Sequence, residues 1–296
     1  MRLILKICFI IVTACILSCS RKSNDSIITL AEEVLDTYPD SALNLLSKID
    51  ETNLSEFQKA QVTLNTVIAK NKMDLDISGD TAIFNAVREI EKQGTDLQKA
   101  KILLYAGRVL YERHDYENAL SYVLDAKNYS SKIEDNNLKG LIIADLGRLN
   151  YQESHYEIAI SHYKQAFSYF CKTNSYNNQI ISLQMIGNCF LLSDYAGKKD
   201  SSFYYYDEAI KISEQFAEKC ALGSLLSNLG VFYIYFGEYQ KSFQMLEKAL
   251  LNAESKSDSL LIFLNLADAY FSVNYLDSAS YYINKTIFFL TMSLYN

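Results

Sequence analysis

The chain repeats one spacing of small residues four times, and this repetition constrains its fold more than any other feature. In each copy, a glycine within an apolar stretch is followed by a small residue about twelve positions later and by another seven positions beyond that. An internal repeat of this length is typical of supersecondary units stacked in series. The copies are Gly107, Ala119 and Ala126; Gly147, Ala159 and Ala166; Gly187, Ser202 and Ala209; Gly230, Ser242 and Ala249; and a looser fifth, Ala267, Ala279 and Thr286.

Apolar residues between the small positions follow the period of an amphipathic helix. The first two copies predict helices over residues 100–113 and 116–130, then over 141–152 and 156–170, each pair joined by a short polar turn. Each copy is therefore an antiparallel helix pair. Glycine within a helix costs about 1 kcal/mol relative to alanine, so glycines in register need a packing reason. We expect them where two helices cross at close range.

Composition supports a helical chain that does not bind nucleic acid. A single proline and no tryptophan among 296 residues favour helices, since proline breaks helix interiors. Lys and Arg number 28 against 35 Asp and Glu, whereas binding to phosphates needs an excess of positive charge. The 23 tyrosines have two interpretations, as fillers of helix–helix contacts or as aromatic anchors in a peptide groove.

The repeat resembles the tetratricopeptide repeat, in which Leu-Gly precedes an aromatic residue and a tyrosine stands before the second helix. The resemblance covers residues 100–290 and implies an all-α, right-handed superhelical solenoid of antiparallel helix pairs. HEAT-type helix pairs have a similar period but lack this pattern of small residues. The matching segments are Leu146-Gly147, Leu229-Gly230 with Tyr233, Leu266-Ala267 with Tyr270, and the turns at residues 115–120, 155–160 and 238–243.

The spacing departs from the family in two ways. Gly107, Gly147 and Gly187 follow one another at 40 residues, against about 34 in the standard unit. The step from Gly187 to Gly230 is 43, because residues 194–201 add three positions before Ser202. We expect long second helices, polar connectors and one longer turn.

Residues 27–99 carry a weaker form of the same architecture. A first helix is predicted over 27–37, a second opens at residues 38–43 around Pro39, and a further pair covers 57–72 and 81–93. Pro39 suits the first turn of a helix. The predicted organisation is a signal peptide at 1–18, a flexible tether at 19–26, divergent helix pairs at 27–99 and the main array at 100–296.

The beginning of the chain resembles a bacterial lipoprotein signal peptide. Arg2 and Lys6 precede an apolar run of secretory length, and Ile16-Leu17-Ser18-Cys19 resembles a lipobox. The resemblance implies cleavage before Cys19, lipidation of its thiol and anchorage in the bacterial cell envelope, at the periplasmic face or outer membrane. The alternative is an ordinary signal peptide with an incidental cysteine.

The tetratricopeptide resemblance also implies a groove, lined by the first helices, that receives peptides or protein segments. Residues at one level of successive first helices supply directed hydrogen-bond donors suited to carboxylate or backbone recognition. The alternative is that these side chains are solvated or paired locally. The groove residues implied are Arg108, Arg148 and Asn188, with Tyr111, Tyr151, Gln184 and Tyr235 as neighbours.

No motif points to catalysis. The only histidines are His114 and His155 in turns and His162 on a second helix, and neither a nucleophile elbow nor a phosphate loop is present. Cys171, Cys189 and Cys220 lack metal-ligand spacing and do not suggest a disulfide framework. We expect no enzyme activity, metal, cofactor or small-molecule substrate.

The last residues are too apolar for a typical solenoid cap and too short for a membrane helix. Residues 286–296 either pack back on the array, present a face to a partner, or belong to a truncated relative of bacterial regulators. The leading hypothesis is a membrane-anchored protein-interaction scaffold. The alternative is the sensory input domain of a membrane-bound transcriptional regulator that lacks its effector part.

Overall fold

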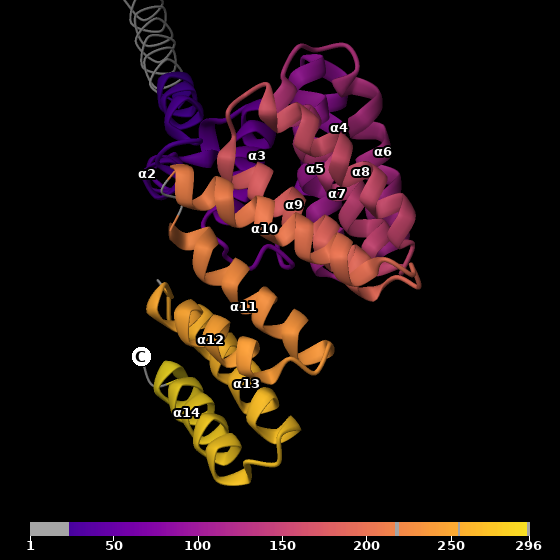
Figure 1. Cartoon of the computed structure of the whole chain (residues 1–296). Helices are drawn as coiled ribbons and strands as arrows, with labels where there is room; N and C mark the ends of the chain where they lie inside the picture. Colours follow the sequence, from indigo (N-terminus) through magenta and orange to yellow (C-terminus); the bar gives the residue numbers. More distant parts are fainter. Residues whose placement is uncertain (1–23, 217–218, 254, 295–296) are drawn as a thin grey trace, which may run out of the picture. The chain divides into compact units, whose positions relative to one another are not determined.

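The computed structural model describes residues 24–216, 219–253 and 255–294, and their regular structure is helical (Figure 1). The chain divides into two compact units, the first ending at Leu138 and the second beginning at Lys139. Residues 24–34 are helical, and the helices that follow are α2 (Pro39–Leu46), α3 (Glu56–Lys72), α4 (Ile83–Gln93), α5 (Asp96–Glu112), α6 (Tyr116–Ser130), α7 (Asn136–Gln152), α8 (Tyr156–Cys171), α9 (Tyr176–Leu192), α10 (Lys198–Phe216), α11 (Lys219–Tyr235), α12 (Tyr239–Leu251), α13 (Lys256–Ser272) and α14 (Leu276–Leu294), with one 3₁₀ turn, η1, at Glu51–Asn53.

The helices pack as sequential pairs. In the first unit α3 packs on α4 and α5 on α6, while α3 also contacts α5. In the second unit α9 pairs with α10, α11 with α12 and α13 with α14, and α11 contacts both α9 and α13. In Figure 1, α11 to α14 lie side by side in chain order. The predicted all-α arrangement of antiparallel pairs is confirmed, and α6 begins and ends at the predicted residues.

The repeated glycines lie where the two helices of a pair cross. A Cβ atom added at Gly230 would lie 2.6 Å from the side chain of Leu246, and one at Gly107 would lie 2.8 Å from Val123 Cγ2. At Gly147 and Gly187 the added atom would meet the ring of a tyrosine on the second helix at 3.0 Å. The expected packing role of these glycines is confirmed.

The small residues on the second helices complete this contact. The Ser202 hydroxyl on α10 donates a 2.7 Å hydrogen bond to the Gly187 carbonyl on α9. Ala209, seven residues later, packs with Leu225 of the following first helix, and Ala249 packs with Ile262 in the same way. The first small residue therefore faces the other helix of its own pair, and the second faces the first helix of the next pair.

Several first helices end in the same left-handed turn. His114, Ser154, Gly237 and Asn274 have φ between 60° and 72°. The following backbone N–H donates to a carbonyl five residues earlier, as in Asp115 to Leu110 at 2.9 Å, which closes the helix end. The turn after α9 differs, because Ser193 is extended and residues 193–197 connect to α10. This is the longer turn expected after Gly187, although residues 198–201 already belong to α10.

Residues 24–93 form helices in the predicted order, but some of these helices begin or end at other residues than predicted. Pro39 occupies the first turn of α2, as expected. Residues 24–26, which the sequence placed in a tether, begin the first helix, where Asp25 accepts a hydrogen bond from Gln58 Nε2. The predicted division between residues 99 and 100 falls within α5. Residues 1–23, including the lipobox and Cys19, lie outside the described residues.

The described part of the C-terminal apolar segment, residues 286–294, forms the second half of α14, which packs on α13. The Phe263 ring of α13 lies 6.0 Å from the Tyr282 ring and 5.7 Å from the Phe289 ring, centroid to centroid. The opposite side of α14 is exposed. Within the described residues, none of the helices combines the length and apolarity needed to cross a membrane.

Replacing Gly230 by alanine should destabilise the chain. The new methyl group would overpack the buried Leu246 side chain, at a cost of about 1–3 kcal/mol. Alanine returns about 1 kcal/mol of helix propensity, so we expect a net loss of about 1 kcal/mol in the free energy of unfolding. Urea unfolding followed by circular dichroism measures it. Gly79→Ala, at a position with no atom within 4 Å of the added Cβ, is the control; a Gly230→Ala chain more stable than the wild type would contradict the packing role.

Candidate functional site

The first helices of the second unit carry a set of side chains at or near equivalent positions of the repeat. We call this set the first-helix surface. It mixes amide, hydroxyl, aromatic and aliphatic side chains. Its residues are Arg148 and Tyr151 on α7; Ile181, Gln184 and Asn188 on α9; Ser227 and Tyr235 on α11; and Leu261, Leu264, Asn265 and Phe271 on α13.

Asn188 is held in a fixed orientation by side chains of α9 and α10. Its Oδ1 accepts a hydrogen bond from the Tyr206 hydroxyl, and its Nδ2 lies 3.7 Å from the Met185 sulfur. Tyr206 is buried on α10, and this burial raises the pKa of its phenol above the usual range, so it stays a donor at neutral pH. Because Oδ1 is occupied, the amide offers its Nδ2 donor to a ligand.

A polar contact joins the next two first helices. Asn265 Nδ2 of α13 donates a 3.0 Å hydrogen bond to Ser227 Oγ of α11, 38 residues earlier. Ser227 is buried and Asn265 half-buried, so the remaining acceptor atom of the amide lies near the surface. With Gln184 and Asn188 on α9, the surface carries carboxamide groups on two helices. Carboxamides suit the N–H and C=O groups of an extended peptide.

The α13 part of this surface is apolar and exposed. Leu261, Leu264 and Phe271 are 55%, 48% and 66% exposed, and they fall on one side of the helix with Asp268. Leu266 and Phe263, on the other side, are buried in the contact with the rest of the unit. Large apolar side chains grouped on one exposed face mark an interaction site more often than scattered ones do.

Arg148 and Tyr151 on α7 are engaged within their own repeat. Arg148 Nη2 lies 3.4 Å from Oδ1 of the buried Asp145, one helical turn earlier. The Tyr151 ring meets the Tyr156 ring edge-to-face at 5.8 Å and packs against the cluster around Ala159. These contacts fit the alternative of local pairing, and they fix both side chains beside the surface.

Tyr235 stands at the C-terminal end of α11 in a group of lysines. Its hydroxyl accepts a 2.9 Å hydrogen bond from Lys198, and its ring is half exposed. Glu238 lies 2.5 Å from both Lys199 and Lys241, and these ammonium groups hold the pKa of its carboxyl below the ordinary value. The positive charges here are therefore partly neutralised.

The first unit contains the remaining predicted residues. Arg108 Nη1 donates a 2.6 Å hydrogen bond to Asn71 Oδ1 of α3, and its guanidinium lies 5.0 Å from the Tyr105 ring centre. Tyr111 packs against Tyr116 at 5.2 Å across the turn. Asn71 was missed by sequence reasoning, although it precedes Arg108 by 37 residues, about one repeat.

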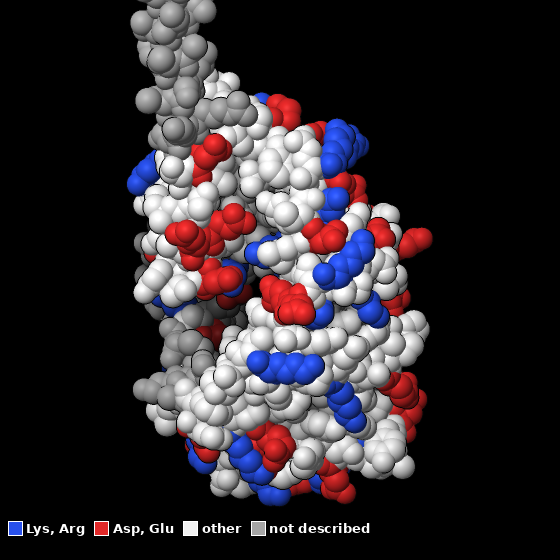
Figure 2. Space-filling model, turned by 90° about the horizontal axis from the view of Figure 1, so that it is seen from above, with Lys and Arg blue, Asp and Glu red and all other residues white. Residues whose placement is uncertain are grey.

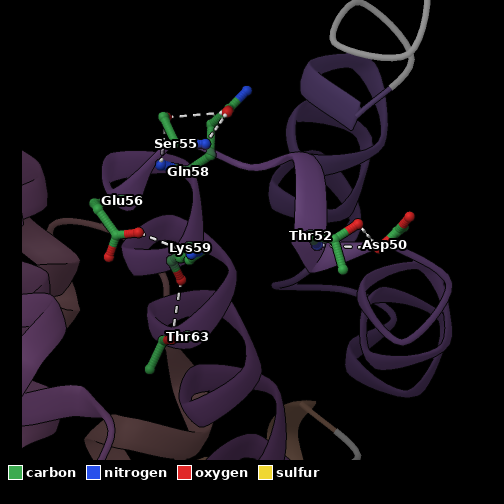
Figure 3. Close-up of polar contacts among 7 residues, drawn as sticks. All are labelled: Asp50, Thr52, Ser55, Glu56, Gln58, Lys59 and Thr63. Atoms are coloured by element: carbon green, nitrogen blue, oxygen red, sulfur yellow. Dashed lines mark hydrogen bonds and ion pairs between the residues drawn. The ribbon is translucent and has the colours of Figure 1, made fainter. Parts of the chain in front are cut away.

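A polar pocket of about 430 Å³ lies between α3 and α4 in the same unit. The capping box of Ser55 and Gln58 fixes the start of α3, where Glu56 pairs with Lys59 at 2.8 Å (Figure 3). Thr63 donates to the Lys59 carbonyl on the same wall. The pocket is lined by both acidic and basic side chains. In the described parts of the chain, no group of His, Cys, Asp and Glu side chains is placed to hold a metal ion.

Charge is mixed as well on the face seen in Figure 2, where acidic and basic side chains are interspersed rather than gathered into a field of one sign.

The groove residues named from the sequence lie on first helices of both units. Arg108 and Tyr111 are on α5 in the first unit, and the others are on α7, α9 and α11 in the second. Ser227, Asn265 and the exposed apolar residues of α13 were not named. Counting one repeat of about 37 residues onward from α11 would have found Leu261 and Leu264.

No family model matches the chain. It is 26% identical over 162 residues to the regulatory protein RapG of Bacillus subtilis, and the match covers 54% of this chain but 43% of RapG. The matched part therefore spans less than half of that relative's length.

Solved structures establish the fold. A Rap protein in complex with Competence and Sporulation Factor aligns with a TM-score of 0.71 at 13% identity, over 91% of this chain and 77% of that one. A signal-transduction ATPase of Pyrococcus horikoshii with a tetratricopeptide repeat sensor aligns at 0.67 and 16%, over 94% and 44%. NprR in complex with its cognate peptide NprX aligns at 0.62 and 16%, over 90% and 76%. The tetratricopeptide-type fold is thus confirmed.

Replacing Tyr206 by phenylalanine should release Asn188. The substitution leaves the Asn188 carbonyl oxygen without its buried donor, which costs about 1 kcal/mol of unfolding free energy. Thermal unfolding measures this loss. Tyr204→Phe is the matched control, because Tyr204 is exposed on the same helix and should tolerate the change. Equal stability of the two variants would show that the Tyr206 hydroxyl does not hold the amide.

Proposed function

We propose that this chain is a non-catalytic tetratricopeptide-repeat scaffold that binds an extended peptide or protein segment on the first-helix surface of its second unit. The observation that carries the proposal is the exposed face of Leu261, Leu264 and Phe271 on α13, the helix whose Asn265 carboxamide bonds Ser227 of α11. Apolar side chains supply affinity, and the amides fix the direction and register of a bound backbone.

The apolar face supplies part of the free energy that such binding needs. Burying one leucine or phenylalanine side chain contributes about 1.5–3 kcal/mol, and a micromolar complex needs about 8 kcal/mol. A few buried anchors account for most of the affinity in interfaces of this kind. On α13 two exposed acidic side chains, Asp258 and Asp268, stand near this apolar face. We therefore infer a preference for peptides with apolar side chains and without acidic ones.

The comparisons support this proposal through the fold. A Rap protein and NprR, two proteins of similar fold, were each solved in complex with a signalling factor or a cognate peptide. In this chain, the residues that would bind are those of the first-helix surface. We propose no cofactor, metal, nucleic acid or small-molecule substrate.

The proposed location is the bacterial cell envelope, with Cys19 as the lipidated residue. The basis is the lipobox-like sequence that ends at Cys19 and follows an apolar run of signal-peptide length. Anchored there, the array would capture peptides at the periplasmic face or the outer membrane.

A second candidate is a sensory role, in which peptide binding is the input to a regulator. The observation that favours it is the similarity to the tetratricopeptide repeat sensor of the Pyrococcus protein. Both candidates bind a peptide. They differ in whether binding only captures the peptide or also signals to a regulator. Both therefore depend on the test of peptide binding.

Peptide binding should depend on the α13 face. Random peptides displayed on phage are selected on the full chain, and the tightest binder, made with a fluorescent label, serves as the probe. Leu264→Asp places a charge in the apolar face and should weaken the probe at least about tenfold, the equivalent of about 1.4 kcal/mol. Fluorescence anisotropy measures the dissociation constant.

The matched control is Leu251→Asp, because Leu251 is 86% exposed on α12 and lies off the first-helix surface. This variant should bind the probe as the wild type does. Asn188→Ala should weaken the probe by removing the Nδ2 donor. Unchanged binding in both Leu264→Asp and Asn188→Ala would refute the proposed surface.

Lipidation should depend on Cys19 alone. In a bacterial host fed labelled palmitate, the wild-type chain should carry the label and sediment with membranes, and Cys19→Ala should lose both, since stable anchoring needs the acyl chains. Cys171→Ala, at an exposed cysteine of α8, is the control and should keep them. A labelled Cys19→Ala chain would rule out this anchor.

A further inference from the structure

The polar pocket between α3 and α4 has the size of a small-molecule site. Its volume of about 430 Å³ lies within the range of about 300–1,000 Å³ in which proteins hold small ligands. Ala60 of α3 and Ala86 of α4, both buried, line it, and their side chains end at Cβ. The two helices therefore pack as a pair and still leave room for a ligand between their facing residues.

The residues around the pocket are held in place by local hydrogen bonds (Figure 3). Asp50 Oδ1 accepts hydrogen bonds from the N–H and the hydroxyl of Thr52, at 3.0 Å and 2.6 Å, which fixes the short turn η1 that carries Glu51. The capping box of Ser55 and Gln58 fixes the start of α3. A ligand would thus meet a backbone that is ordered before binding, which lowers the entropic cost of binding.

Two opposite charges that line the pocket have no ion-pair partner among the described residues. Glu56 pairs with Lys59 at 2.8 Å, and Glu89 pairs with a lysine outside the pocket at 2.7 Å. The remaining charged groups are the carboxylate of Glu51 on η1 and the guanidinium of Arg88 on α4. Both side chains are exposed, so a ligand can reach them from solvent, and they are too far apart to pair with each other.

We propose that this pocket binds a free α-amino acid, with its ammonium group on Glu51 and its carboxylate on Arg88. A guanidinium binds a carboxylate through two parallel N–H···O bonds, and the Glu51 carboxylate accepts hydrogen bonds from an ammonium group. A ligand with one charge would satisfy only one of the two groups, whereas a zwitterion satisfies both. The space beside Ala60 and Ala86 is left for the side chain of the ligand.

This site is separate from the proposed peptide surface. The pocket lies in the first unit, whereas the first-helix surface belongs to the second. The amino acid is bound and not converted, so the chain remains a binding protein and gains a second kind of ligand. Because the two sites share no residue, failure of one proposal leaves the other standing.

The test is binding of free amino acids to the full chain. Saturation-transfer difference NMR is recorded with a mixture of the natural L-amino acids, each at about 1 mM so that a submillimolar dissociation constant is detected. At least one amino acid should receive saturation from the wild type. Isothermal titration calorimetry then gives its dissociation constant. Arg88→Gln and Glu51→Gln should each weaken binding at least about tenfold, because each removes one charge-assisted contact.

The amide of the same amino acid separates direct contact from an indirect effect of the substitution. The amide keeps the ammonium group and lacks the carboxylate, so it should bind the wild type weakly, and Arg88→Gln should weaken it no further. Glu51→Gln should still weaken it. A substitution that only disturbed the fold would affect the acid and the amide alike, and circular dichroism verifies that both variants retain their helices.

The controls are Lys48→Gln and Glu91→Gln, which each remove one exposed charge of the same unit outside the pocket. Both variants should bind the amino acid as the wild type does. The proposal would be overturned by a wild type that binds none of the amino acids, by unchanged binding in Arg88→Gln or Glu51→Gln, or by equal weakening in the controls.

Discussion

The close crossing of the two helices in each pair is the contact on which the rest of the structure depends. At Gly107, Gly147, Gly187 and Gly230 the first helix has no side chain, and a residue of the second helix fills the space within 3.0 Å of where a Cβ would be. Each glycine weakens its own helix by about 1 kcal/mol, and the packing that it permits offsets this cost. Because the crossing recurs at the same repeat position, each first helix turns its equivalent side toward its own second helix.

That orientation explains why the candidate site lies where it does. With the glycine side of each first helix committed to the second helix, the remaining side is left for ligands. The character of this side changes along the second unit, since equivalent positions are occupied by Arg148, Asn188, Val231 and Asp268. A constant scaffold thus carries a variable row of side chains, and its α13 end is the most apolar and exposed part.

The sequence was sufficient to predict what depends on spacing within one repeat. The glycines, the bounds of α6 and the turn at His114 follow from local helical periodicity and polar turn residues. It was insufficient for contacts between repeats, such as Arg108 with Asn71 or Asn265 with Ser227, since these depend on how far one helix advances past the next. The sequence was also insufficient to predict which α13 residues are buried. Leu264 is exposed and Leu266 is buried, although both are leucines.

Burial of a repeat position is therefore decided by the neighbouring helices and not by the residue itself. Leu246 and Ile283 stand at equivalent places in consecutive second helices, yet Leu246 is fully buried at the Gly230 crossing and Ile283 is 46% exposed. A solenoid helix that faces water is expected to be polar on its outer side. On its exposed side α14 instead carries Ile283, Ile287 and Leu290, apolar side chains of the kind that internal helices bury.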